Sequence, residues 1–185
     1  TKDGMKISKS IGNVIDPVDL YERFGTDAFR YFFLREFAFG EDGDYSEKRF
    51  IERFNDDLAN DLGNLLSRVA AMVVKYTKGD LTLQKNNKYS EATIKLWTVW
   101  QEHLTNFRFK ECLEEIWKFV TELNIYVDSE KPWELAKNQQ QEKLLTVLSN
   151  LCEGLRHIAL MTAPFMPSIS QIIHKQIGFG ALPQK

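Results

Sequence analysis

A row of apolar residues at steps of three and four positions limits the fold of this chain more than any other feature. The row runs along the stretch 46–78 and consists of Phe50, Phe54, Leu58, Leu62, Leu65, Val69 and Val73. Residues at that spacing share one face of an α-helix, and that face must be buried against another element. At 1.5 Å per residue the helix would be a rod of roughly 45 Å, ending at Gly79.

Further apolar rows with helical spacing follow in the second half of the chain, and no alternating strand pattern competes with them. We predict helices over about 90–107, 109–128, 141–161 and 168–177, and a short turn of helix that begins at Lys131-Pro132-Trp133. Trp97, Trp100 and Trp117 lie on these rows, so we interpret them as core or partly buried residues. The fold predicted after residue 46 is therefore an all-α helical bundle.

The first 45 residues read as a loop followed by two short helices. Asp16 precedes a proline and can cap the first helix, which Gly25 can end. Thr26 is the predicted cap of a second helix over 27–37. After a turn rich in glycine and acidic residues, Ser46 is the predicted cap of the long rod.

Composition bounds the function without identifying it. The chain has 185 residues, 43% of them hydrophobic and 27% charged, and a formal net charge of −2. A protein that gripped nucleic acid over its whole surface would be basic, so any such binding is expected to use a local patch. No apolar run approaches the roughly 20 residues of a membrane span, and no signal peptide is evident. We expect a cytoplasmic protein with no membrane partner.

The cysteines and histidines do not suggest a metal site. Cys112 and Cys152 each lie among apolar residues at helical spacing, which favours reduced core thiols over a disulfide. The three histidines are far apart and lack the spacing of metal ligands. No metal site is therefore expected in this chain.

The first group with chemical potential is the run Lys6-Ile7-Ser8-Lys9-Ser10. Two lysines and two hydroxyls on one loop can contact several phosphate oxygens, since lysine supplies a mobile charge and serine a directional donor. A solvated Lys/Ser loop is the plain alternative. Taken alone, five residues of such common types favour the solvated loop.

The surrounding sequence carries a family resemblance. The stretches 3–17 and 21–31 resemble the KMSKS signature region of class I aminoacyl-tRNA synthetases, with Ile7 where methionine is usual. The resemblance implies that the loop closes over ATP during formation of an aminoacyl adenylate. It implies catalytic roles for Lys6 and Lys9, with Lys9 on the ATP phosphates and Ser8 and Ser10 supporting the nucleotide contact.

Downstream segments resemble the methionyl-tRNA synthetases in particular. They are the stretches 37–46, 54–68, 131–137 and 163–167. This implies a KMSKS and stem-contact segment over 1–45 and an α-helical anticodon-binding domain over 46–185. A synthetase of the valyl, isoleucyl, leucyl or cysteinyl type is an alternative, and so is a helical interaction module that keeps a vestigial loop.

A second group consists of Asn64, Arg68 and Trp133. Asn64 and Arg68 are four residues apart on the predicted rod, so their side chains are neighbours that can read the edge of an unpaired base. Trp133, next to a proline, can stack on that base. Each has a plain alternative, namely a surface amide for Asn64, an ion pair with Asp61 or a glutamate for Arg68, and a core position for Trp133. The resemblance implies contact with the methionine anticodon, notably its cytosine.

Asp57 lies two helical turns before Asn64 on the same rod, toward the ATP loop. We interpret it as a solvated helix charge, with a role in relaying anticodon occupancy as the alternative.

The resemblance also implies partners beyond the chain. The whole enzyme would join methionine to tRNA(Met) through an adenylate, using ATP with Mg²⁺. The Rossmann catalytic domain of that enzyme is absent from this sequence, so we expect a fragment that is inactive alone.

Overall fold

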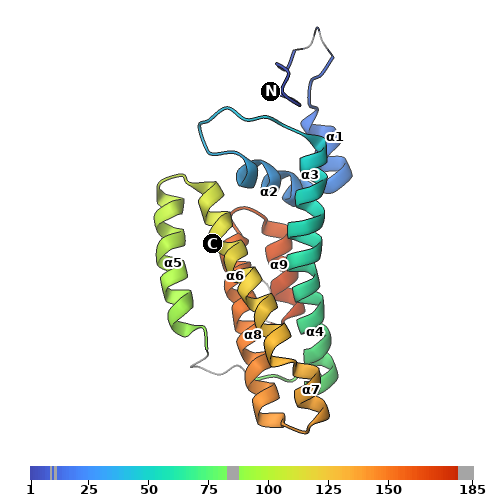
Figure 1. The fold of residues 1–185 in the computed structure, drawn as a ribbon, viewed down its shortest axis with the longest axis vertical. Helices are drawn as coiled ribbons and strands as arrows, with labels where there is room; N and C mark the ends of the chain where they lie inside the picture. The colour runs from blue at the N-terminus through green and yellow to red at the C-terminus, as the bar shows by residue number, and fades with distance from the viewer. Residues whose placement is uncertain (9, 11, 83–87, 179–185) are drawn as a thin grey trace.

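The fold is seen in a computed structural model that describes residues 1–8, 10, 12–82 and 88–178. In this part of the chain the regular structure is helical, apart from isolated β-bridges of Lys2 with Met5 and Tyr45. The helices are α1 (Pro17–Phe24), α2 (Thr26–Glu36), α3 (Glu47–Arg53), η1 (Phe54–Gly63), α4 (Asn64–Thr77), α5 (Ser90–Thr105), α6 (Phe109–Glu130), α7 (Pro132–Lys137), α8 (Gln141–Thr162) and α9 (Pro167–Gln176). The longer helices run along the long axis of the molecule (Figure 1), which confirms the predicted all-α bundle.

A single glycine makes the turn between α1 and α2. Gly25 has a φ of +84°, in the region that favours glycine. Asp16 caps α1 as predicted, because its carboxylate accepts a 2.8 Å hydrogen bond from the Val18 N–H. The prediction that Thr26 caps α2 is wrong, since α2 begins at Thr26 with Gly25 in the capping position. Gly25 turns the chain within one residue and leaves no place for a separate cap.

The predicted rod is present as three consecutive segments, α3, η1 and α4, over residues 47–77. Ser46 stands in the capping position as predicted, but its side chain makes no capping hydrogen bond within the described part. The middle segment, η1, is a π-helix and not an α-helix, and at its end the Asn64 N–H donates to Ala59 O, five residues back. Gly63 suits this junction because a β-carbon there would lie 3.0 Å from a backbone carbonyl oxygen.

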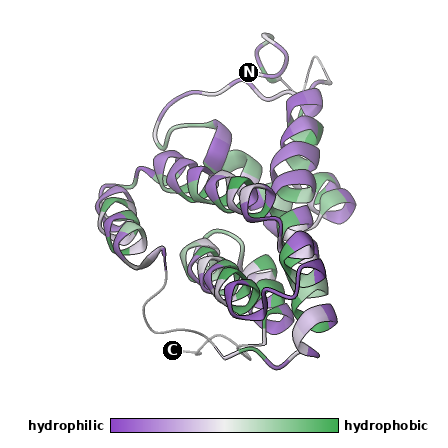
Figure 2. Cartoon of the chain, turned by 60° about the horizontal axis from the view of Figure 1, so that its bottom comes forward, coloured by the Kyte–Doolittle hydropathy of each residue, from purple (hydrophilic) through white to green (hydrophobic). Residues whose placement is uncertain are grey.

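Helices α6 and α8 form the centre of the bundle, and α4, α5 and α9 pack around them. The same helices carry hydrophilic residues on their outer sides (Figure 2). Trp100 and Trp117 are buried and Trp97 is partly buried, as predicted. Cys112 and Cys152 are buried free thiols, and burial raises their pKa values to about 11 and about 12.

Two charged side chains of α2 attach the N-terminal segment to the bundle. Arg30 donates from Nε to Phe165 O at 2.6 Å and from Nη2 to Pro164 O at 2.7 Å. The buried carboxylate of Asp27 accepts a 2.6 Å hydrogen bond from the Ile169 N–H, at the start of α9. These bonds satisfy backbone groups in and after the α8–α9 turn, which a helix terminus cannot satisfy internally. The segment that carries the N-terminal loop is therefore fixed to the end of the bundle.

Candidate functional site

The N-terminal loop is closed on itself by the side chain of Asn13. Its Oδ1 accepts a 2.8 Å hydrogen bond from the Ser8 N–H, and its Nδ2 donates to Lys6 O at 3.0 Å. The Ser8 and Ser10 hydroxyls lie 2.7 Å apart. The structure thus brings Lys6, Ser8 and Ser10, three of the predicted site residues, into one turn, whereas Lys9 lies outside the described residues.

The chain leading into this loop is held by the turn between α2 and α3. The carboxylate of Asp44 accepts hydrogen bonds from the Thr1 hydroxyl at 2.5 Å and from the Gly4 N–H at 3.0 Å. These two bonds, the hydroxyl first, lower the pKa of Asp44. Ile7 lines a surface pocket of about 230 Å³ together with Phe33 and other residues of this region. Ile7 and Lys6 are both exposed to solvent.

Two residues of the second predicted group, Arg68 and Trp133, line a surface pocket between α4 and α7. The pocket has a volume of about 330 Å³ and is lined by Arg68, Ala71, Met72, Lys75, Tyr76 and Trp133. Trp133 is 42% exposed, so the alternative that it belongs to the core is wrong. An exposed indole beside a guanidinium is suited to stacking on a flat, unpaired base.

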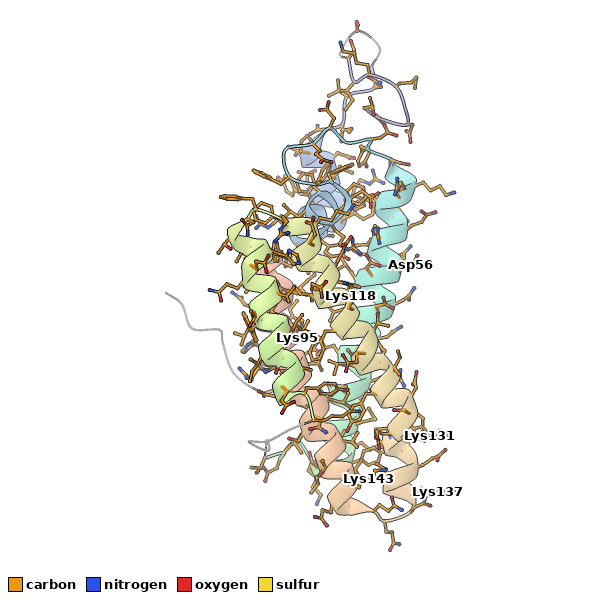
Figure 3. The ribbon with its side chains drawn as sticks, turned by 60° about the vertical axis from the view of Figure 1, so that its left-hand side comes forward. Asp56, Lys95, Lys118, Lys131, Lys137 and Lys143 are labelled. Atoms are coloured by element: carbon orange, nitrogen blue, oxygen red, sulfur yellow. The ribbon has the colours of Figure 1, made fainter. Side chains whose placement is uncertain are left out.

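The local sequence explains why Trp133 lies at the surface. Lys131 adopts a φ of +46° between α6 and α7, and the buried Pro132 occupies the first position of α7. The Lys131 ammonium forms a 3.3 Å ion pair with Glu134, so part of the positive charge near Trp133 is balanced. Figure 3 shows further lysines at this end of the bundle, among them Lys137 and Lys143.

Arg68 lines the pocket while one of its nitrogens is engaged by α6. Its Nη2 lies 2.6 Å from Asp128 Oδ1, a partner that differs from the Asp61 or glutamate considered from the sequence. The two side chains are 39% and 65% exposed. An ion pair so exposed is worth roughly 0–1 kcal/mol, so it does not hold the guanidinium away from a ligand.

Asn64 is exposed at the start of α4, one turn before Arg68, and is not among the residues that line the pocket. The structure therefore brings Arg68 and Trp133 together and leaves Asn64 beside them on the helix surface. The sequence interpretation missed Met72, Lys75 and Tyr76. Their spacing of four, seven and eight residues from Arg68 was the available signal, because such residues share a helix face.

The expectation that Asp57 is a solvated helix charge is wrong. Its Oδ2 accepts a 2.6 Å hydrogen bond from the Tyr31 hydroxyl and a 3.2 Å bond from Arg53 Nη1, and its side chain is only 13% exposed. Tyr31 is buried, and that burial, followed by the charge of Asp57, raises the pKa of its hydroxyl. A buried hydroxyl needs a polar partner, and Asp57 supplies it from the rod.

The described residues include no group of three or more histidine, cysteine or acidic side chains arranged to hold a metal ion. None of the helices in the same ranges is long and apolar enough to cross a membrane. Two histidines have internal surroundings: His157 accepts a 2.9 Å hydrogen bond from Trp97 Nε1, and burial lowers the pKa of His174.

Comparison with known proteins places this geometry in a family. Residues 1–70 match the family described as tRNA synthetases class I (M), and residues 89–182, half of the chain, match the anticodon-binding domain of tRNA ligase. The methionine–tRNA ligase of Fusobacterium nucleatum is 45% identical over 184 residues, and that of Thermotoga maritima is 40% identical over 190 residues. The chain belongs to the methionyl-tRNA synthetase family.

Solved structures of the methionyl-tRNA synthetase family have the same fold. The Mycobacterium tuberculosis methionyl-tRNA synthetase in complex with methionyl-adenylate superposes with a TM-score of 0.83 and 33% identity, over 97% of this chain and 40% of that one. The matched region is 96% of this chain for the Fusobacterium ligase and 100% for the Thermotoga ligase. It is only 29% and 30% of the length of those two ligases. The resemblance noted in the sequence is thereby confirmed, and a valyl, isoleucyl, leucyl or cysteinyl type is not supported.

Proposed function

We propose that this chain is the part of a methionine–tRNA ligase that binds the CAU anticodon of tRNA(Met). The observation that carries the proposal is the pocket between α4 and α7 that Arg68 and Trp133 line together. The indole of Trp133 stacks on an unpaired anticodon base. Support also comes from the relatives in Fusobacterium nucleatum and Thermotoga maritima, which are methionine–tRNA ligases.

The chemistry of Arg68 and Asn64 fits cytosine among the unpaired bases. The Watson–Crick edge of cytosine presents two acceptors, O2 and N3, and one donor, the N4 amino group. Arg68 donates to the acceptors, and the amide oxygen of Asn64 accepts from the amino group. Uracil presents a donor at N3 and acceptors at O2 and O4, so the same pair of side chains would meet a mismatched edge.

We further propose that the N-terminal loop supplies phosphate-binding groups to ATP. Lys6 and Lys9 neutralise phosphate charge while methionine carboxylate attacks the α-phosphorus and pyrophosphate leaves. Ser8 and Ser10 add hydroxyl donors to the phosphate oxygens. Mg²⁺ accompanies ATP, and the Rossmann catalytic domain that holds the rest of the nucleotide lies outside this sequence. The exposed position of Lys6 and Ser10 supports this role.

The division of labour within the chain follows from these two sites. Residues 1–45 form the loop and stem-contact segment, and residues 46–185 form the anticodon-binding domain. The start of the rod at Glu47 supports a boundary there. The hydrogen bonds of Asp27 and Arg30 to the α8–α9 region would keep the two parts in a fixed relation when tRNA binds.

The anticodon proposal is tested by the affinity of this chain for an RNA stem-loop with a CAU anticodon. Trp133→Ala is expected to weaken binding by about 5- to 150-fold, because a base–aromatic stack is worth about 1–3 kcal/mol. Trp133→Phe should keep most of the affinity, since it keeps a ring. Phe39→Ala removes a ring that is 66% exposed in the α2–α3 connection and is the matched control. Unchanged binding by Trp133→Ala, or an equal loss in the control, would contradict the proposal.

The ATP proposal is tested by Lys9→Ala in a full-length ligase that carries this sequence. Methionyl-adenylate formation, followed by ATP–pyrophosphate exchange, is expected to fall by about tenfold or more, since the lost charge stabilises the transition state. The affinity for the CAU stem-loop should not change, because the N-terminal loop lies at one end of the molecule and α7, which carries Trp133, lies at the other (Figure 1). An unchanged exchange rate would remove Lys9 from the ATP role.

A further inference from the structure

Asn13 is the one side chain in the described N-terminal loop that bonds to the backbone on both sides of Ile7. Its Oδ1 accepts from the Ser8 N–H at 2.8 Å, and its Nδ2 donates to Lys6 O at 3.0 Å. Asn13 is itself only partly exposed. One planar amide thus holds a carbonyl and an N–H that lie two residues apart.

Neighbouring contacts close the same turn. The Gly12 N–H donates to Ser8 O at 3.2 Å, and Gly12 has a φ of +74°, which glycine adopts without strain. Three residues beyond Asn13, Asp16 caps α1 through the Val18 N–H, so the chain that carries the amide is anchored to a helix. The amide of Asn13 is therefore presented from a fixed support toward the loop.

We propose that Asn13 is a positioning residue for adenylate formation: it presets the curvature of the ATP-binding loop so that Lys6 and Ser8 face the phosphates together. This inference rests on the proposed ATP role of the loop. A flexible loop must be ordered when the nucleotide binds, and preorganisation removes part of that entropic cost. Asn13 thus acts through the loop backbone and needs no contact with ATP.

The chemistry of the amide limits which residues can do this. The Ser8 N–H requires an acceptor, and Lys6 O requires a donor, so only a side chain with both can bridge them. Aspartate keeps the acceptor but places a second oxygen against Lys6 O. Alanine removes both bonds. A series at position 13 therefore separates the two bonds from each other.

The experiment compares Asn13→Ala, Asn13→Asp and the control Asn138→Ala in a full-length methionine–tRNA ligase that carries this sequence. Asn138 is an exposed asparagine directly after α7, far along the chain from the loop. ATP–pyrophosphate exchange gives kcat and the KM for ATP and for methionine. For Asn13→Ala we expect kcat/KM for ATP to fall by about tenfold or more, with the KM for methionine unchanged. In Asn13→Asp the kcat/KM for ATP should fall by a smaller factor, and in the control Asn138→Ala it should equal that of the wild type.

Two further measurements separate positioning from a merely structural role and from failure of the ATP proposal. CAU stem-loop affinity and the thermal unfolding midpoint should be the same in Asn13→Ala and wild type. If both fall along with exchange, Asn13 serves stability and the inference is overturned. If Lys9→Ala slows exchange while Asn13→Ala does not, the inference fails and the ATP role stands. If neither variant slows exchange, the ATP role fails and the inference fails with it.

Discussion

Arg68 can serve Asp128 and a bound base at the same time. The guanidinium carries five N–H donors, and the ion pair with Asp128 engages Nη2. The remaining donors on Nη1 and Nε are available to a base in the pocket. In the proposed site, Asp128 would hold one side of the guanidinium and leave the other side to the base. This arrangement explains how an arginine with an internal partner can still be a recognition residue.

Lys75 lines the same pocket, and its Nζ lies 5.3 Å from the centroid of the Tyr76 ring. Contacts of lysine with nucleic-acid phosphates carry no direct sequence information, and we expect Lys75 to make such a contact at the proposed base site. We expect Lys75→Ala to weaken the binding of the CAU stem-loop and of stem-loops with an altered anticodon by the same factor. The slope of log affinity against log salt concentration should become shallower by about one, as for one lost phosphate contact. Binding isotherms at several salt concentrations measure both quantities. A loss confined to the CAU stem-loop would make Lys75 a base-reading residue instead.

At the scale of the helices, α8 packs closely on α6 where Gly154 faces Leu123. A β-carbon at position 154 would lie 2.7 Å and 2.8 Å from the two methyl carbons of Leu123, which is fully buried. Gly154→Ala is expected to lower the free energy of unfolding by up to about 2 kcal/mol, because overpacking costs about 1–3 kcal/mol and the gain in helix propensity offsets roughly 1 kcal/mol of it. Urea denaturation measures the change. Adding Leu123→Val to Gly154→Ala should recover part of the lost stability. If Gly154→Ala alone is more stable than the wild type, the Leu123 side chain moves aside and the prediction is wrong.

Glu153 on α8 makes the bundle sensitive to acid. Its hydrogen bonds from Arg156, followed by that from His157, lower its pKa from 4.5 to about 2. Because the folded pKa lies below the unfolded one, the stabilisation is present above pH 4.5 and is lost as the pH falls toward 2. Glu153→Gln should lower the unfolding free energy at neutral pH by up to about 3 kcal/mol.

Chemical denaturation of both proteins across this pH range measures the effect. The difference in unfolding free energy between wild type and Glu153→Gln should shrink as the pH falls from 4.5 toward 2. A difference that stays constant with pH would assign the lost stability to packing and not to the charge of Glu153.

The helices were predictable because the buried face of each one appears in its own stretch of sequence as apolar residues at helical spacing. The rod, α6 and α8 follow apolar rows at steps of three and four, and Gly25 and Gly79 mark ends where the chain must turn. The π-helical character of η1 was not predictable, because an apolar row at four-residue steps fits an α-helix as well. Local sequence thus gives the extent of a helix better than its hydrogen-bond register.

The site depended on contacts between distant parts of the chain. No periodicity relates Arg68 to Trp133, and only the family resemblance suggested that they act together. Asp128, the partner of Arg68, and Tyr31, one partner of Asp57, lie on other helices, so the local sequence carries no sign of these two contacts. The second partner of Asp57, Arg53, lies four residues earlier on the rod and could have been found from helical spacing. In contrast, the lining residues Met72, Lys75 and Tyr76 follow from helical spacing once Arg68 is chosen.

On the scale of the whole molecule, the two proposed sites lie at opposite ends of its long axis. Figure 1 shows the N-terminal loop at one end and α7 at the other, with the rod of α3, η1 and α4 between them. A rod of 31 helical residues spans on the order of 45 Å, so an anticodon base in the pocket cannot touch ATP at the loop. An effect of one site on the other would have to pass through the elements between them. These include the rod, through the contact of Tyr31 with Asp57, and the α8–α9 region, through the bonds of Arg30 and Asp27.

The separation also predicts what the isolated chain cannot do. The loop offers lysines and hydroxyls to phosphates, and Lys6 and Ser10 are exposed to solvent. We expect the isolated chain to catalyse no ATP–pyrophosphate exchange with methionine, because no catalytic domain is present to hold the nucleotide and the amino acid. Exchange above the rate without protein would contradict the division of the ATP site between two parts of the enzyme.

The measurement that tests the central claim most directly is the ratio of affinities of this chain for two stem-loops. One carries the CAU anticodon, and in the other the cytosine alone is replaced by uracil. Because Arg68 and Asn64 match the edge of cytosine and not that of uracil, we predict preference for CAU by about 5-fold or more, equivalent to about 1 kcal/mol. Equal binding of the two stem-loops would contradict recognition of the anticodon by this pocket.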